Sequence, residues 1–149
     1  MIFLDANLFL RFLVPPESPE LQRFAVQARS LWRGIRERTV RATTSEVVLH
    51  EVCYVLHSPR QYGYDVPKIV KAVTSLVMLP GLDFPSGDRD IYLRALDLWS
   101  QHPKLGFADS VIAARCERAG HELATFDRHF QDLSFLQLWQ PASSGTDGT

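Results

Sequence analysis

Apolar residues recur along the chain with two spacings, which predict alternating strands and helices. The first four residues are all apolar, a run too short for an amphipathic helix but typical of a parallel strand that is buried on both faces. Other stretches repeat apolar residues at i, i+3, i+4 and i+7, as an amphipathic helix does. We expect helices over 8–13, 20–36, 45–57, 66–77, 88–99 and 107–119, and strands over 1–4, 39–43, 82–84, 122–126 and 135–139.

The alternation of strands and helices predicts an α/β fold, namely a three-layer α/β/α sandwich with a central, mainly parallel sheet. A chain of 149 residues, 46% of them hydrophobic, is long enough to bury one core. We therefore expect a single domain over residues 1–140. Residues 141–149 are rich in Pro, Ser, Gly and Thr, which is typical of a flexible polar tail.

The composition of the chain argues against a membrane protein, a secreted protein and a cysteine-based site. No apolar run approaches the roughly 18 residues that a membrane span needs, and the N-terminus lacks the basic flank of a signal peptide. We therefore expect a soluble, cytoplasmic protein without a membrane partner. Cys53 and Cys116 form no Cys-x-x-Cys motif, so we interpret both as small buried side chains rather than as zinc ligands or a disulfide. The formal net charge of −1 leaves a mildly basic surface if several carboxylates gather in one site.

Three aspartates lie where a predicted strand ends or a predicted helix begins. Asp5 directly follows the first strand and Asp127 the fourth, while Asp109 lies in the first turn of the last long helix. Because ligands bind at the carboxyl edge of open α/β sheets, we expect these three side chains at one site. Each also has an ordinary interpretation. Asp5 can cap a helix, and Asp109 can interact favourably with the helix dipole.

The third predicted helix carries two further carboxylates. Glu51 lies within the stripe that we interpret as apolar, where a carboxylate must be paired, protonated or bound to a cation. From that helix it can reach the same sheet edge as the three aspartates. Glu46 points to another side, and Thr43-x-x-Glu46 has the pattern of a capping box, which is sufficient to explain it.

Four carboxylates within a few ångströms repel one another unless a cation lies among them. Hard oxygen ligands select Mg²⁺, or Mn²⁺ in its place, rather than Zn²⁺. Such a site can generate hydroxide from bound water and orient an in-line attack, so hydrolysis of a phosphodiester is the chemistry that this pattern favours. We expect Asn7 to hold Asp5 by a hydrogen bond from outside the ligand set. Thr125 either hydrogen-bonds a carboxylate of the site, which we favour, or simply fills a position in a strand.

The chain contains four stretches built around these acids. They read Met-Ile-Phe-Leu-Asp-Ala-Asn-Leu-Phe-Leu-Arg-Phe-Leu, Val-Val-Leu-His-Glu-Val-Cys-Tyr-Val-Leu, Phe-Ala-Asp-Ser-Val-Ile-Ala-Ala and Ala-Thr-Phe-Asp-Arg-His-Phe. In this order they resemble the signature stretches of PIN-domain nucleases, and the similarity covers Met1 to about Trp139. Within that family the chain is most similar to VapC, the ribonuclease toxins of type II toxin–antitoxin pairs. Each stretch alone is weak evidence of this resemblance, but the occurrence of all four in this order is specific for the family.

The resemblance implies a site and an activity. Asp5, Glu51 and Asp109 would bind the metal, and Asp127 would be a fourth acid that is less uniformly required. The family implies Mg²⁺-dependent endoribonuclease activity, usually on structured RNA such as transfer or ribosomal RNA, a homodimer, and inhibition by a small VapB-like antitoxin. His129 stands where many relatives carry a further acid, which leaves open whether one or two metals bind. We interpret His129 as an exposed helix residue, with a ligand or proton-shuttle role as the alternative.

The resemblance also implies a surface for partners. Antitoxins of such enzymes lay a helix in an apolar groove and place a basic side chain near the acids. Arg11 is the candidate for the basic rim, and the aromatic candidates for the wall are Phe9, Phe12 and Trp32, for which we favour a core role instead. The same groove could admit single-stranded RNA, with bases stacking on Tyr62 or Tyr64.

Two other functions fit part of the pattern. A phosphatase with a nucleophilic aspartate after the first strand would resemble the haloacid dehalogenase pattern Asp-x-Asp-x-Thr or Val, but Asn7 replaces the second acid and Phe9 occupies the fifth position. An interaction module that kept the fold and lost the chemistry is expected to have lost at least one acid, whereas all four acids are present. The nuclease interpretation is therefore favoured.

Overall fold

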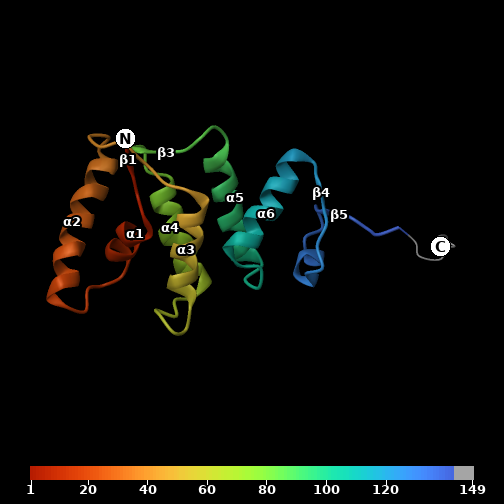
Figure 1. Cartoon of the computed structure of the whole chain (residues 1–149), viewed down its shortest axis with the longest axis horizontal. Coiled ribbons are helices and arrows are strands. Elements are labelled where there is room, and N and C mark those ends of the chain that lie inside the picture. The colour runs from red at the N-terminus through yellow and green to blue at the C-terminus, as the bar shows by residue number, and fades with distance from the viewer. Residues whose placement is uncertain (143–149) are drawn as a thin grey trace.

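The computed structural model describes residues 1–142 (Figure 1). The elements in chain order are β1 (Ile2–Phe3), α1 (Ala6–Leu13), α2 (Pro19–Arg36), β2 (Ala42–Thr43), α3 (Glu46–His57), α4 (Val66–Val77), β3 (Leu82–Asp83), α5 (Asp88–Gln101), α6 (Gly106–Ala119), β4 (Glu122–Leu123), the 3₁₀ helix η1 (Arg128–Asp132) and β5 (Gln137–Leu138). The tail expected over 141–149 falls, from residue 143 onward, outside the described residues.

The six helices expected from the apolar periodicity form, with ends that differ from the expected ones by two residues at most. Local signals set these ends. The Ser18 hydroxyl accepts a hydrogen bond from the backbone N–H of Leu21 and starts α2, and Gly120 adopts a left-handed conformation with a φ of 70° and ends α6. The capping box predicted for Thr43 and Glu46 is wrong, because Ser45 is the N-cap of α3.

All strand pairs in the described residues are parallel, which confirms the predicted α/β class with a parallel sheet. β1 pairs with β2 and β2 pairs with β3, so that Ile2 lies opposite Ala42 and Ala42 opposite Leu82. β4 pairs with β5 in a separate two-stranded sheet. We expected the acids to emerge along one sheet edge. Instead the strands that precede Asp5 and Asp127 belong to different sheets.

β1 is an edge strand, which corrects the expectation that it is buried on both faces. Its residues Ile2 and Phe3 are 44% and 59% exposed. The reason is that, among residues 1–142, β1 has a paired neighbour on one side only, so one flank of the strand and the side chains beside it stay uncovered. Leu4, which directly follows the strand, is buried in the core.

The core lies between the helices, which follow one another across the long axis of the molecule (Figure 1). Phe9 of α1 meets Trp32 of α2 edge to face, with ring centroids 4.9 Å apart, and the Trp32 indole N–H donates to the Leu8 carbonyl at 2.9 Å. At the other end, α5 and α6 pack closely and carry β4 and β5 on their outer side. None of the helices in residues 1–142 combines the length and the apolar character that crossing a bilayer requires.

Candidate acidic site

Asp5 directly follows the buried Leu4 and caps α1. Its Oδ1 accepts a 2.7 Å hydrogen bond from the backbone N–H of Asn7, and its side chain is exposed. Asp5 is therefore the N-cap of α1, as its ordinary interpretation predicts. The bond from Asn7 comes from its main-chain N–H and not from its side chain, so it is part of the helix cap, and the role predicted for the Asn7 side chain stays a prediction.

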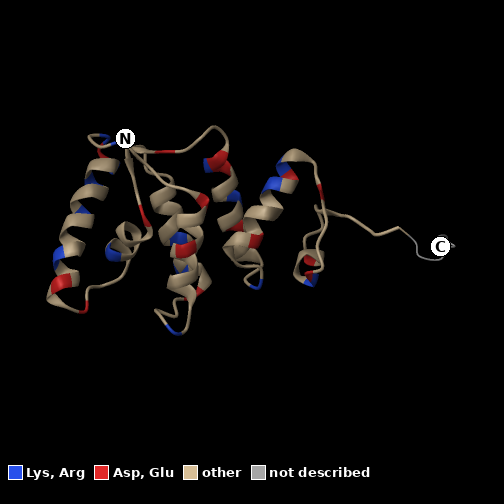
Figure 2. Cartoon of the chain, viewed as in Figure 1, with Lys and Arg blue, Asp and Glu red and all other residues tan. Residues whose placement is uncertain are grey.

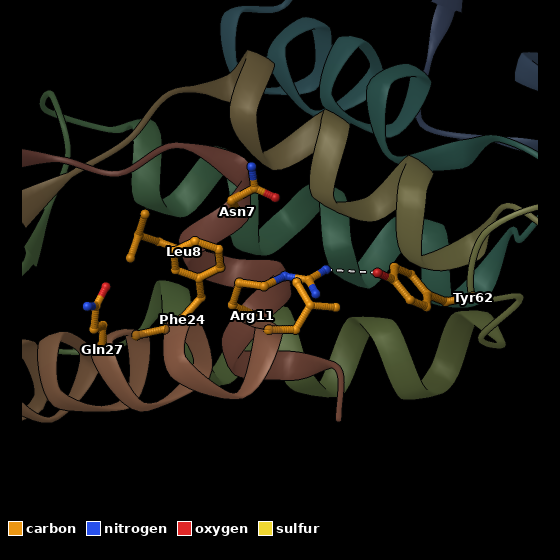
Figure 3. A pocket seen from close by; sticks show the side chains of 8 residues that line it. Asn7, Leu8, Arg11, Phe24, Gln27 and Tyr62 are labelled. Atoms are coloured by element: carbon orange, nitrogen blue, oxygen red, sulfur yellow. Dashed lines mark hydrogen bonds between the residues drawn. The ribbon is translucent and has the colours of Figure 1, made fainter. Parts of the chain in front are cut away.

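A groove of about 540 Å³ opens beside Asn7, between α1 and α2 (Figure 3). Its lining residues are Asn7, Leu8, Arg11, Leu21, Phe24, Gln27, Ala28 and Tyr62. Arg11 crosses its floor, where Nη2 donates a 2.8 Å hydrogen bond to the Tyr62 hydroxyl. Phe9 and Trp32 belong to the core, as favoured from sequence, and Phe24 of α2 supplies the aromatic wall that sequence reasoning missed.

Glu51 lies on an exposed face of α3, which corrects its predicted place in an apolar stripe. The buried side of α3 runs through Leu49, Val52, Cys53 and Leu56. Val47, which the prediction placed inward, is 75% exposed. Both faces of this helix carry apolar residues, so periodicity selected the wrong one. Because Glu51 is in contact with solvent, its charge needs no buried partner.

Asp109 lies in the first turn of α6 and is half-buried. Burial raises the pKa of its carboxyl group, and the negative charge of Asp127 raises that pKa further. The side chains of His129 and His50 act in the opposite direction and lower it. These four residues therefore form one electrostatic group, and Asp109 is the member that is most removed from water.

Asp127 is the N-cap of η1 and stands next to His129. Its Oδ1 accepts a 2.9 Å hydrogen bond from the backbone N–H of His129, and His129 Nδ1 lies 3.2 Å from the same oxygen. His129 is exposed, as expected, and touches the acid beside it. The Thr125 hydroxyl accepts a 3.0 Å hydrogen bond from the Asp127 backbone N–H, so it orients the main chain of Asp127 rather than a carboxylate.

A second groove, of about 270 Å³, lies beside Asp109 between α3 and α6. Aromatic and imidazole rings from α3 and α5 line it, among them His50, Tyr54 and Trp99. The Trp99 indole N–H is buried and has no hydrogen-bond partner in residues 1–142. Cys53 also faces this groove, and burial raises the pKa of its thiol far above the usual range, which leaves it an inert thiol as predicted.

His50 is the site residue that sequence reasoning missed. The sequence gives it no role, yet it lines the groove beside Asp109 and its charge lowers the pKa of the Asp109 carboxyl group. The signal was present in α3, where Glu46, His50, Cys53 and His57 recur at helical spacing on the side that packs toward α6. Arg115 of α6 confirms that side, because its Nη2 lies 2.7 Å from Glu46 Oε1.

The charge of Asp127 acts on the carboxyl group of Asp109, whereas Asp5 and Glu51 are not among the groups that shift its pKa. Within the described part of the chain, no three His, Cys, Asp or Glu side chains lie close enough to hold a common ion. Asp5 follows β1 and Asp127 follows β4, and α6 lies between β1 and β4 in Figure 1.

The chain forms an α/β domain in which helices connect parallel strands. Its candidate acids lie after a strand or in the first turn of a helix. Residues 2–136 match the PIN domain family, and the chain belongs to that family. PIN domains are generally nucleases and typically use divalent metal ions, which supports a hydrolase that acts on nucleic acid. Comparison with curated protein sequences gives no match.

Proposed function

We propose that the protein is a Mg²⁺-dependent endoribonuclease and the toxin of a VapBC-type toxin–antitoxin pair, which hydrolyses phosphodiester bonds of cytoplasmic RNA. The observation that carries this proposal is the match of residues 2–136 to the PIN domain family. Asp109, half-buried in the first turn of α6, supports it, because burial and the charge of Asp127 raise the pKa of its carboxyl group. Two neighbouring carboxylates, one of them half-buried, are a site where a divalent cation lowers the electrostatic free energy. Mn²⁺ is expected to replace Mg²⁺.

The proposed ligand set is Asp5, Glu51, Asp109 and Asp127, with Asn7 and Thr125 as groups that position Asp5 and Asp127 through main-chain hydrogen bonds. All six residues precede or begin a helix or lie on one, so their backbones are held by regular structure.

Basic side chains on α2 support an RNA substrate. Arg23, Arg29, Arg33 and Arg36 are exposed along this helix, and Figure 2 shows the resulting row of cationic positions. Arg29, Arg33 and Arg36 also line a groove of about 330 Å³ together with Phe12, which offers a ring beside the cations. Cations bind the phosphate backbone of any sequence, and aromatic rings accept unstacked bases. Transfer and ribosomal RNA are the candidate substrates.

The groove between α1 and α2 supports the proposed antitoxin. It is lined mainly by apolar side chains, it holds one cation, Arg11, and it begins at Asn7, two positions from Asp5. An amphipathic helix binds such a groove by placing its apolar face inside. A VapB-like segment bound there would cover Asp5 and block access to the acids. We also propose a homodimer, as the family resemblance implies.

The test is cleavage of total bacterial RNA by the purified protein with Mg²⁺ or Mn²⁺, against an EDTA control. Cuts at a few discrete sites that vanish with EDTA and return with added metal are the expected result. Binding of Mn²⁺, followed by electron paramagnetic resonance, reports the metal independently of cleavage. A protein that binds no Mn²⁺ and cuts no RNA, even after any bound antitoxin has been stripped away, contradicts the proposal and favours an interaction module.

A further inference from the structure

The groove between α3 and α6 is bordered by a hydrogen-bond donor that lacks an acceptor. Trp99 of α5 lines this groove and is only 2% exposed. Among the buried side-chain nitrogen and oxygen atoms of residues 1–142, its indole Nε1 alone has no hydrogen-bond partner. A buried N–H group without an acceptor is costly and rare in folded proteins. The indole therefore indicates an acceptor that comes from outside the chain.

The size of the groove and its aromatic wall suit one planar ring system. Its volume of about 270 Å³ far exceeds the roughly 30 Å³ that one water molecule occupies in the liquid. Pockets for drug-sized ligands begin near roughly 300 Å³. His50 and Tyr54 both line the groove, with ring centroids 6.2 Å apart, and Tyr54 is 66% exposed. A ring that enters the groove can therefore stack on Tyr54.

The charges and polar atoms of the groove favour a neutral ligand. The residues that line it include no Lys or Arg, and the carboxylate among them, Asp109, repels an anion. His57 Nδ1 lies 3.0 Å from the Tyr64 carbonyl oxygen. Because a carbonyl oxygen only accepts, Nδ1 carries the proton, and Nε2 is an acceptor in the neutral ring. Trp99 and His57 thus provide a donor and an acceptor on two neighbouring rings, whose centroids are 5.8 Å apart.

The start of α6 forms the end of the groove next to Asp109. Gly106 has a φ of 76°, which favours glycine, and a Cβ atom there would meet no other atom within 4 Å. No side chain caps α6, so its first backbone N–H groups are further donors. This end of the groove is therefore open and can bind acceptor atoms.

We propose that this groove binds one unstacked base of the RNA beside the bond that is cut, an assignment that rests on the proposed nuclease function. A nucleobase is a neutral planar ring that carries acceptor atoms beside N–H donors, which is the complement of this groove. Asp109 lines the groove and belongs to the proposed ligand set, so the base lies next to the acids. Trp99 donates to the base and Tyr54 stacks on it, and the two residues set the sequence at which the chain cuts.

Titration with single ribonucleosides tests the base site without any need for activity. The chain has three tryptophans, so the isotopically labelled protein gives three indole N–H resonances in an NMR spectrum. Trp99→Phe identifies the resonance of Trp99. We expect at least one of the four common ribonucleosides to shift that resonance until it saturates. The resonance of Trp32, whose N–H already donates to the Leu8 carbonyl, should stay in place. Ribose, which lacks the base, is the control ligand.

Two substitutions at position 54 separate stacking from a change in fold. Tyr54 is exposed, so its replacement leaves the core intact. Tyr54→Phe keeps the ring and should retain the shift of the Trp99 resonance. Tyr54→Ala should weaken nucleoside binding by roughly 5-fold or more. If no nucleoside shifts the Trp99 resonance of the wild type, or if ribose shifts it equally, the groove holds no base and the proposal is wrong.

Sequencing the cut ends of a random-sequence RNA tests the effect on cleavage. The wild type with Mg²⁺ should prefer one base at one position beside the cut. Trp99→Phe and Tyr54→Ala should still cut and reduce this preference by roughly 5-fold or more. Trp139→Phe, at a half-exposed position after β5, is the matched control and should keep it.

An unchanged preference in both Trp99→Phe and Tyr54→Ala overturns the base site while the nuclease function stands. A nucleoside shift in a wild type that cuts no RNA has the opposite meaning, because the groove then binds a base and the proposed function fails.

Discussion

Opposing influences act on the carboxyl group of Asp109. Burial and the charge of Asp127 raise its pKa, and His129 and His50 lower it, with the raising influences prevailing. A carboxyl whose pKa is higher in the folded than in the unfolded protein binds more protons when folded. The folded state therefore loses stability as pH rises from the ordinary carboxyl pKa through the raised one. At neutral pH the ionised Asp109 destabilises the metal-free protein.

Asp109→Asn should consequently raise the melting temperature of the metal-free protein at pH 7.5, because the amide keeps a polar side chain and carries no charge. The difference from wild type should shrink as pH falls through the raised pKa of Asp109, because protonation then removes the charge of the wild-type carboxyl group as well. Thermal unfolding in EDTA at several pH values measures this. Asp132→Asn removes an exposed carboxylate nearby and is the control. Equal melting temperatures of Asp109→Asn and wild type at pH 7.5 would contradict this account of the site.

Residue-scale patterns placed three of the acids correctly along the chain. Asp5, Asp109 and Asp127 each stand at the start of a helix, as expected from the residues before and after them. Their grouping was harder to predict. The pair Asp109 and Asp127 forms within one chain, and the position of Asp5 relative to it depends on strand pairing between residues distant in sequence. Local patterns do not encode that pairing.

At the scale of elements, α3 decides how Glu51 is presented. Helical periodicity predicted the span of α3 well, but apolar residues on two sides left the buried side ambiguous. Tertiary packing settles it, because Leu49, Val52 and Leu56 face the core while Val47 and Glu51 face outward. A carboxylate on the outward side is available to a metal or a partner.

Alanine substitution tests this orientation of α3. Leu49→Ala removes a fully buried side chain and should lower the free energy of unfolding by about 2–5 kcal/mol. Val47→Ala, two positions earlier, removes an exposed side chain and should change it by less than about 0.5 kcal/mol. Urea denaturation of both variants gives the comparison. If Val47→Ala is the more destabilising of the two, α3 is rotated and Glu51 faces inward.

At the scale of the whole molecule, the strands divide into two sheets that a group of helices separates (Figure 1). The α/β class and the parallel strand direction were predictable, because strands alternate with crossover helices. Which strands become neighbours was not. The strands are two residues long, so packing of the intervening helices sets their positions.

If the protein hydrolyses RNA with a metal ion that Asp109 helps to bind, the rate of RNA cleavage should fall in Asp109→Asn. The wild type, Asp109→Asn and Asp132→Asn are compared on the same RNA at the same Mg²⁺ concentration. Losing a metal ligand removes several kcal/mol of transition-state stabilisation, so we predict a rate loss of at least roughly 100-fold for Asp109→Asn. Asp132→Asn should cleave like wild type. Equal, metal-dependent cleavage by wild type and Asp109→Asn would contradict the account.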